Sequence, residues 1–223
     1  LSPKRESILS TMKELAKIFG SEARVKILRL FLLNADEPVD SEDISKRLRI
    51  ARTKAAQECK QLASVDFLKK RAFYKEVVRK GKKVKKKTEG WCLNPEFSYN
   101  DSLRGLLVEE EFLNKKELVK RFKKAGKIKL FVVSGIFIKD QEKEGRVDML
   151  IVGDNLRKSW IEDTVRKLEA EVGKELSYAV FDTQEFIYRI EMYDKLVRDI
   201  LDFPHEKLVS SPSLLALSTP TLK

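Results

Sequence analysis

Residues 67–93 decide how the first half of this chain folds, and they read FLKKRAFYKEVVRKGKKVKKKTEGWCL. Two runs rich in apolar and aromatic residues flank a basic centre, Arg79-Lys80-Gly81-Lys82-Lys83, in which the glycine supplies a turn. Apolar runs on both sides of a short glycine-containing centre are typical of a β-hairpin. The sequence therefore predicts two antiparallel strands joined by a basic tip.

The positive charge of the chain is concentrated in this predicted hairpin. Residues 69–87 contain 11 Lys or Arg and a single acid, Glu76, in a chain whose formal net charge is +11. A local basic block is the electrostatic signature of a surface that binds a polyanion. A solvated lysine tract is the alternative, but the apolar residues that frame the lysines favour a folded hairpin.

Length and composition limit the class of protein. A chain of 223 residues with 42% hydrophobic residues is sufficient for two packed domains of about 100 residues each. No apolar run approaches the roughly 20 residues needed to cross a bilayer, and the polar N-terminus lacks the features of a signal peptide. We therefore expect a cytoplasmic protein with no membrane partner.

Few residues are available for metal or histidine chemistry. Cys59 and Cys92 are far apart and lie in apolar patterns, which is typical of reduced, partly buried thiols in the cytosol. One histidine, His205, and two separated cysteines cannot form a dedicated zinc site, and His205 is interpreted as structural. We expect neither a metal nor a cofactor.

Four amphipathic segments precede the hairpin, and the spacing of their apolar residues predicts helices at residues 8–19, 22–33, 41–48 and 51–63. Gly20 is expected to end the first helix and Ser21 to cap the second. Ser41 is expected to cap the third helix, which has acids in its first turn. The fourth helix has one apolar face, so its polar side chains should point away from the core.

Two short helices joined by a tight turn and followed by a basic hairpin are the order of a winged helix-turn-helix. In that arrangement the second helix enters the major groove of DNA, and the hairpin, or wing, lies along phosphates. Residues 19–30, 44–48 and the helix from Ala51 resemble the arsenic-repressor-like (ArsR-like) winged-helix regulators, over about residues 15–97. The resemblance implies DNA contacts from the second helix and the wing, at Arg52, Thr53, Lys54, Gln57, Lys60, Arg79, Lys80, Lys82 and Lys83.

Two positions depart from this family pattern. The turn, which usually contains a glycine, has Arg49, and the cap position of the second helix has Ala51 rather than Ser or Thr. Arg49 would contact a DNA phosphate or face solvent, and both interpretations remain open. The Cys and His clusters of the metal-sensing members are absent, so a response to metal is not expected.

The second half of the chain has a different character, because residues 101–223 contain 22 basic and 22 acidic residues. A helix is predicted over residues 103–124, and strands are predicted at 128–133, 147–152, 176–181 and 207–210. Further helices are predicted at 159–172 and 184–201, with a loose tail from Ser211. The predicted fold class is α+β, with a winged helix at 1–98, a helical connector at 99–126, a small mixed-sheet domain at 127–210 and a tail at 211–223.

The order strand, loop, strand with an aspartate, helix, strand resembles the minimal nucleotidyltransferase domain of the DNA polymerase β superfamily. That family holds a phosphate at a Gly-Ser pair and two metal ions at three carboxylates. Here Ser134-Gly135 stands at the pair, Arg146 and Ser177 stand at two carboxylate positions, and only Asp148 is acidic. The resemblance implies a vestigial nucleotide site at Ser134, Gly135, Arg146 and Asp148, without transferase activity. Arg146 would pair with Asp148 or hold a phosphate.

A winged helix fused to such a domain resembles prokaryotic transcriptional regulators, over about residues 15–209. This implies a regulator, not an enzyme, that binds double-stranded DNA sequence-specifically as a homodimer. Its second domain would serve sensing, dimerisation or scaffolding. The alternatives are an active nucleotidyltransferase and an antitoxin-like component of a toxin–antitoxin pair. RNA as the nucleic acid, and a nucleotide or protein effector, also remain open.

Overall fold

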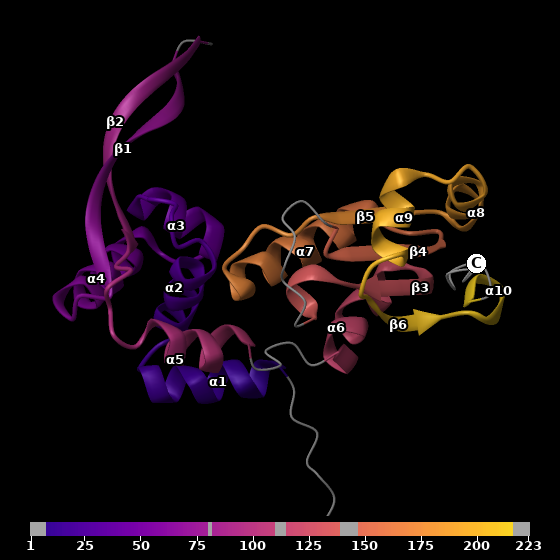
Figure 1. Ribbon diagram of the computed structural model, residues 1–223, viewed down its shortest axis with the longest axis horizontal. Coiled ribbons are helices and arrows are strands. Elements are labelled where there is room, and N and C mark those ends of the chain that lie inside the picture. Colours follow the sequence, from indigo (N-terminus) through magenta and orange to yellow (C-terminus); the bar gives the residue numbers. More distant parts are fainter. Residues whose placement is uncertain (1–7, 80–81, 110–114, 139–146, 216–223) are drawn as a thin grey trace, which may run out of the picture. The chain divides into compact units, whose positions relative to one another are not determined.

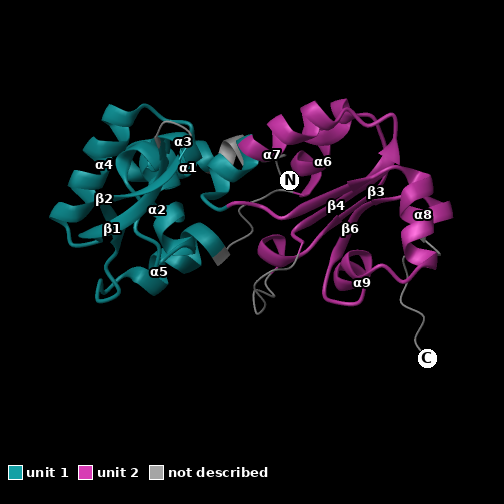
Figure 2. Ribbon diagram, turned by 90° about the horizontal axis from the view of Figure 1, so that it is seen from above, with its two compact units in different colours: residues 1–112, 167–174 teal, residues 113–166, 175–223 magenta. Residues whose placement is uncertain are grey.

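A computed structural model describes residues 8–79, 82–109, 115–138 and 147–215. Within these ranges the chain has a mixed α+β structure with ten α-helices and two small sheets (Figure 1). It divides into two compact units, unit 1 with residues 1–112 and 167–174, and unit 2 with residues 113–166 and 175–223 (Figure 2). The fold class is therefore α+β, as the sequence predicted.

The helices of unit 1 lie where the sequence predicts them, at α1 Ile8–Phe19, α2 Glu22–Leu33, α3 Ser41–Leu48 and α4 Arg52–Ser64. Helix α2 is central to the core, because Val25, Ile27 and Phe31 are completely buried. The cap at Ser21 is confirmed, since its hydroxyl accepts a hydrogen bond from the N–H of Arg24. The cap at Ser41 is wrong: the Asp40 carboxylate accepts hydrogen bonds from the N–H groups of Glu42 and Asp43 at the start of α3.

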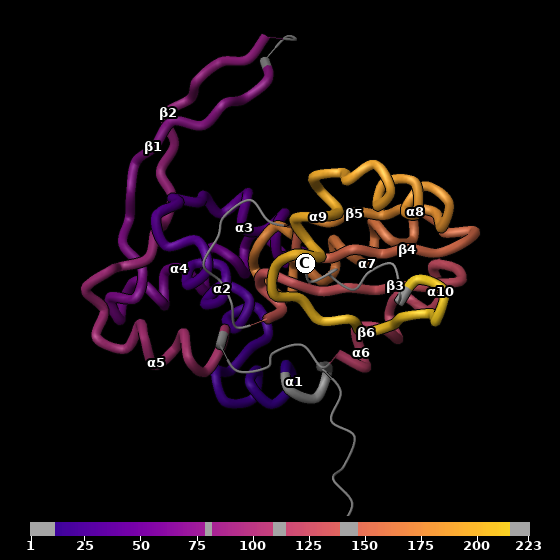
Figure 3. The backbone as a smooth tube through the Cα atoms, turned by 45° about the vertical axis from the view of Figure 1, so that its right-hand side comes forward, coloured from indigo at the N-terminus to yellow at the C-terminus, as the bar shows by residue number. Residues whose placement is uncertain are grey.

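The predicted hairpin consists of β1 Leu68–Arg79 and β2 Lys82–Leu93, paired antiparallel from Leu68↔Leu93 to Arg79↔Lys82. Its base belongs to the core of unit 1, where Leu68, Trp91 and Leu93 are buried. The backbone of Val39 pairs with that of Trp91 and adds a short third partner there. Beyond the base, the two strands continue as a twisted ribbon that leaves the helices of unit 1 (Figures 1 and 3).

Unit 2 contains a four-stranded sheet in the order β5-β4-β3-β6. Its strands are β3 Lys127–Val133, β4 Met149–Asp154, β5 Tyr178–Phe181 and β6 Glu206–Ser210. Strand β4 runs parallel to β5, while β3 runs antiparallel to both β4 and β6, so the sheet is mixed. One face packs against α8 Thr183–Glu191, α9 Lys195–Leu201 and α10 Pro212–Leu215. The other face is covered by α6 Lys115–Phe122 and the first turns of α7 Lys158–Val172 (Figure 2).

Three predicted elements differ from the structure. The helix predicted over residues 103–124 is divided into α5 Asn100–Arg104, a π-helical turn, then α6 and a 3-10 turn, and residues 110–114 lie outside the described ranges. The division places Leu107 in the core of unit 1, whereas Phe122 packs on the sheet of unit 2. The helix predicted over 184–201 breaks at Tyr193, whose φ is 53°, because Asp194 caps a new helix. The predicted loose tail begins with α10, which buries Leu214.

Candidate nucleic-acid interface

One face of α4 carries most of the predicted recognition side chains. Ala55, Cys59 and Leu62 are buried against the core, and this orients the helix so that the opposite side faces solvent. Thr53, Gln57 and Lys60 are exposed on that side, and Arg52 is exposed at the N-terminal end of α4. The cap position, Ala51, makes no side-chain hydrogen bond, so the first N–H groups of α4 have no side-chain cap. Helix α4 therefore presents polar side chains and an uncapped N-terminus at one surface.

Lys54 is different from the other predicted recognition residues, because its ammonium group lies 2.9 Å from the Glu58 carboxylate. Glu58 is buried and also accepts hydrogen bonds from Ser21 Oγ and Arg24 Nε, both at 2.8 Å. Burial opposes the charged form of Glu58, but the hydrogen bonds from Lys54, Ser21 and Arg24 outweigh it and lower its pKa. Lys54 thus compensates a buried charge of the fold.

Arg49 occupies the turn between α3 and α4 in a left-handed conformation, with φ 53° and ψ 47°. Glycine is favoured in this conformation because it has no Cβ. The Arg49 side chain is exposed. Its backbone conformation therefore preserves the tight turn even though the residue departs from the family pattern.

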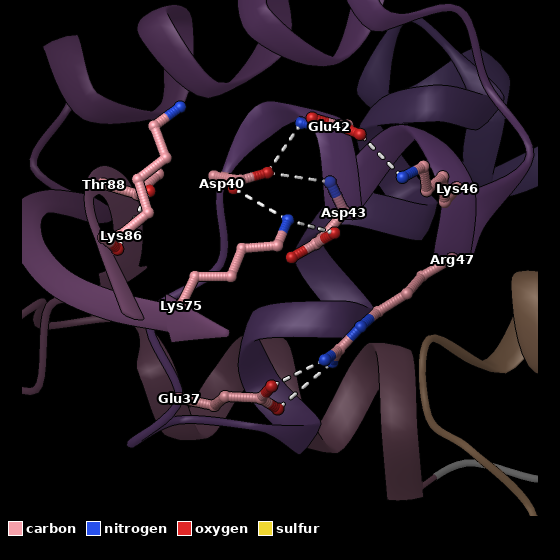
Figure 4. A network of polar contacts seen from close by, with 9 residues as sticks. All are labelled: Glu37, Asp40, Glu42, Asp43, Lys46, Arg47, Lys75, Lys86 and Thr88. Atoms are coloured by element: carbon pink, nitrogen blue, oxygen red, sulfur yellow. Dashed lines mark hydrogen bonds and ion pairs between the residues drawn. The ribbon is translucent and has the colours of Figure 1, made fainter. Parts of the chain in front are cut away.

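Three lysines of β1 have partners within unit 1. Lys75 lies 2.6 Å from an Asp43 oxygen and 3.1 Å from an Asp40 oxygen, and so ties β1 to the start of α3 (Figure 4). Burial opposes the charged form of Lys75, but its hydrogen bonds to Asp43 and Asp40 outweigh burial and raise the pKa of the ammonium group. Lys69 pairs with Glu96 at 2.9 Å, and the Lys70 ammonium lies 5.7 Å from the centre of the Trp91 ring.

The half of β2 next to the tip, residues 82–87, here called the distal half of the hairpin, leaves its lysines without such partners. Within the described ranges, no acidic group pairs with the exposed lysines Lys82, Lys85, Lys86 and Lys87. Lys83 makes only a 3.8 Å contact with Glu76, and both side chains are largely exposed. Figure 4 shows that the Lys86 side chain, opposite Lys75 in the register, does not reach the acids that Lys75 contacts. The side chain of Arg79 and the whole of Lys80 lie outside the described residues.

The geometry of the ribbon arranges these cations in rows. Lys83, Lys85 and Lys87 alternate along β2 and therefore share one face, on which the exposed side chains of Tyr74 and Val78 also lie. Each strand has 12 residues, which corresponds to a ribbon about 40 Å long. A two-stranded ribbon has the width that the major groove of DNA accepts.

The predicted vestigial site brings together three of its four residues. Gly135 follows β3 with a φ of 53°, which favours glycine, and a Cβ there would collide with Asp148 Oδ1 unless that side chain shifted. That oxygen accepts the N–H of Ile136 at 3.2 Å, and Asp148 Oδ2 accepts the N–H of Ser177 at 2.9 Å. Ser134 is buried and its hydroxyl donates to the carbonyl of Val147. Arg146 lies outside the described residues.

Asp148 thus occupies the place that a ligand would take in this loop. Its carboxylate receives backbone N–H groups from both neighbouring segments, and its own N–H and carbonyl bond to Ser177 and Ser134. Backbone N–H groups of this kind could otherwise bind a phosphate. The arrangement holds the ends of β3, β4 and β5 together.

Chemistry that needs clustered ligands has few residues to draw on in the described ranges. They contain no group of three His, Cys, Asp or Glu side chains that could hold a metal ion. Burial, together with the nearby Glu58 charge, raises the pKa of the Cys59 thiol to about 12, so the thiol remains protonated at neutral pH.

None of the described helices is long and apolar enough to cross a membrane.

Sequence reasoning missed Asp40, Glu58 and Lys75, which position the interface. The available signal was their spacing: Glu58 follows Lys54 by one helical turn at the edge of the apolar face, and Asp40 precedes two further acids at a helix start. In comparisons with known proteins, no family model matched the chain, and no curated protein or solved structure was significantly similar to it.

Proposed function

We propose that unit 1 is a winged helix-turn-helix that binds double-stranded DNA, and that the protein is a transcriptional regulator. The observation that carries this proposal is the distal half of the hairpin, where Lys82, Lys85, Lys86 and Lys87 have no acidic partner in the described ranges. Cations that the fold does not use are available to phosphates, and each such contact releases a counterion from DNA. The wing is thus the source of affinity.

The exposed side of α4 supports the same proposal as the source of sequence choice. A helix that follows a short helix and a tight turn enters the major groove, where Arg and Gln side chains make bidentate contacts to guanine and adenine. Gln57 and Lys60 are exposed on that side, and Arg52 is exposed at the N-terminal end of the helix. Lys54 takes no part in base reading in this proposal, since it neutralises Glu58.

The direct test compares the wild-type chain with a hairpin variant, Lys82→Gln/Lys85→Gln/Lys86→Gln/Lys87→Gln, by fluorescence anisotropy with duplex DNA at several salt concentrations. The slope of log K against log salt should become shallower by about 0.9 for each lost phosphate contact, or roughly 3–4 in total. A matched control, Lys13→Gln/Lys17→Gln/Lys174→Gln/Lys195→Gln, removes four exposed lysines elsewhere and should keep the wild-type slope. Equal slopes for the two variants would exclude the wing as the DNA contact.

Selection of bound duplexes from a random pool tests sequence choice. We expect a preferred DNA site. Arg52→Ala or Gln57→Ala should reduce the discrimination between bases at one position of that site by about 1–3 kcal/mol. A two-fold symmetric site would support binding as a homodimer, since a dimer binds two half-sites about one helical turn apart. A pool without any enrichment would contradict sequence-specific regulation.

We further propose that unit 2 is a nucleotidyltransferase-like domain without transferase activity. One carboxylate, Asp148, remains near the Ser134-Gly135 loop, and it is engaged by backbone N–H groups rather than free to hold metal. Incubation with labelled ATP and magnesium should transfer no label to nucleic acid or protein. Magnesium-dependent labelling by the wild-type chain, lost in Asp148→Asn, would establish the enzyme alternative instead.

A further inference from the structure

Unit 2 contains a second cluster of basic residues, although the net charge of residues 101–223 is zero. Residues 115–129 include eight Lys or Arg and one acid, Glu117. The segment runs from α6 through the 3-10 turn Lys123–Ala125 into the first residues of β3. The last cations of this segment, Lys123, Lys124 and Lys127, lie at the end of the sheet where β3 begins.

The fold places a second basic segment, at the start of α7, beside this one. Gly126 allows the close approach, because its φ is 143° and a Cβ there would lie 2.6 Å from the Asn155 carbonyl oxygen. The Arg157 N–H donates to the Ala125 carbonyl at 2.7 Å, and the Arg157 guanidinium donates to the Lys124 carbonyl. The two segments carry the exposed cations Lys123, Lys124, Lys127, Arg157 and Lys158, here called together with Trp160 the Trp160 cluster.

Trp160 fixes two of these cations in place. The Lys124 ammonium lies 5.9 Å and the Arg157 guanidinium 5.8 Å from the centre of the indole ring. Cation–π contacts of this kind hold positive groups near one another without neutralising their charge. The cluster is therefore a preformed arrangement of like charges and not a set of independent lysines.

The cations of the Trp160 cluster have few internal partners: the Arg157 guanidinium donates to the Lys124 carbonyl, and the charge of Lys127 contributes to the lowered pKa of the Asp154 carboxyl. Within the described ranges none of its five cations forms an ion pair, whereas the neighbouring Lys129 pairs with Asp154 at 2.8 Å and Lys115 with Glu206 at 2.5 Å. Arg157 and Lys158 also stand at the N-terminal end of α7, where the helix dipole disfavours cations. Unpaired charges in an unfavourable position suggest a ligand outside the chain.

We propose that the Trp160 cluster is a second nucleic-acid surface, which binds the sugar-phosphate backbone without reading bases. All five cations are exposed and spread over two segments, which suits an extended polyanion better than a compact phosphate held in a concave pocket. A membrane surface would need exposed apolar side chains to insert. Trp160 is the single large apolar side chain of the cluster as defined above; it is 37% exposed, and its ring contacts cations. This surface is independent of the DNA-binding face proposed for unit 1.

The experiment uses the full chain in the hairpin-variant background, so that the wing contributes little. The cluster variant, Lys123→Gln/Lys124→Gln/Lys127→Gln/Lys158→Gln, is titrated with a labelled 20-residue oligothymidylate at low salt. We expect at least roughly tenfold weaker binding and a salt slope shallower by about 0.7 per lost contact. The matched control adds Lys13→Gln/Lys17→Gln/Lys174→Gln/Lys195→Gln to the same background and should bind as the background does.

Two further measurements keep the proposal falsifiable. The same four positions changed to Arg should retain binding, which separates charge from an effect on folding. Equal binding of the oligonucleotide by the cluster variant and its control would overturn the proposal. It would also be overturned if these lysines were needed to bind phosphatidylserine vesicles but not to bind the oligonucleotide. If the wing does not bind DNA, the hairpin variant alone should have the same salt slope for duplex binding as the wild type. The two proposals can therefore be disproved separately.

Discussion

The distal hairpin and the Asp148 loop both lie at the end of an antiparallel strand pair, and they use charge in opposite ways. At the end of β1 and β2, the lysines Lys82, Lys85, Lys86 and Lys87 have no acidic partner within the described ranges. At the end of β3 and β4, the Asp148 carboxylate accepts N–H groups from Ile136 and Ser177, and a Cβ on Gly135 would collide with it. The hairpin lysines remain exposed to solvent, whereas the Asp148 carboxylate is used in hydrogen bonds within the fold.

This difference indicates which charged residues serve the fold and which are available to a ligand. A polar group that is satisfied internally contributes to stability, and its removal leaves unpaired partners. An exposed cation with no partner contributes little or nothing to stability. Mutation should therefore separate the two regions, with binding lost at the hairpin and stability lost at the loop.

The largest effect should follow charge reversal in the distal hairpin. Lys82→Glu/Lys85→Glu/Lys86→Glu/Lys87→Glu should weaken duplex DNA binding by roughly a thousandfold or more, because four attractions to phosphate become repulsions. The urea midpoint should change little, since surface substitutions of this kind are usually within about 0.5 kcal/mol. Anisotropy and urea denaturation measure the two quantities. A large loss of stability would show that these lysines hold the fold, and would remove the contrast.

Asp148→Ala should have the opposite pattern, with a loss of about 2 kcal/mol in the free energy of unfolding and unchanged DNA affinity. The reason is that the N–H groups of Ile136 and Ser177 lose their acceptor. Asp148→Asn, which keeps one acceptor oxygen, should lose about half as much. Chemical denaturation followed by tryptophan fluorescence measures the difference. A stable Asp148→Ala chain would mean that the loop does not depend on this carboxylate.

A smaller effect should distinguish two lysines that face each other in the ribbon. Lys75→Met should cost about 1 kcal/mol, because Lys75 joins Asp40 and Asp43 but is still partly exposed. Lys86→Met removes the same charge from the opposing position and should leave the unfolding midpoint unchanged. If the two variants are equally stable, the contacts of Lys75 with Asp40 and Asp43 do not stabilise the fold.

The smallest effect concerns pH and the same contact. Burial opposes the charged form of Asp40, but hydrogen bonds from the Asp43 N–H and Lys75 lower its pKa. A depressed pKa contributes stability above the ordinary aspartate value near 4, and this contribution is lost as the pH falls. Lys75, with a raised pKa, loses its contribution only as the pH rises above about 10. The stability difference between wild type and Asp40→Asn should thus shrink below about pH 4 in urea unfolding, and a constant difference would contradict the charge contact.

Local patterns account for what the sequence predicted correctly. The bounds of α1 and α2 agree with the predicted ranges, and the hairpin lies where its apolar runs and glycine indicated. Apolar periodicity and turn residues act over a few positions, so they can be read directly. The exposed side of α4 could be predicted for the same reason, because the apolar face that packs on the core determines which side of the helix faces solvent. The affiliation with the two families, and DNA binding itself, remain predictions.

Tertiary contacts decided which charges are available. Lys75 and Lys86 are both lysines of a basic ribbon, yet only Lys75 meets the acids of α3, which are 32 and 35 positions away in the sequence. Lys54 was predicted to contact DNA, and it is paired with a glutamate that packing buries. The Trp160 cluster exists only because Gly126 brings two segments together. The sequence by itself determined the elements and the total charge, since both are local or additive. Which cations remain unpaired depends on distances between remote residues, and those are set by the fold.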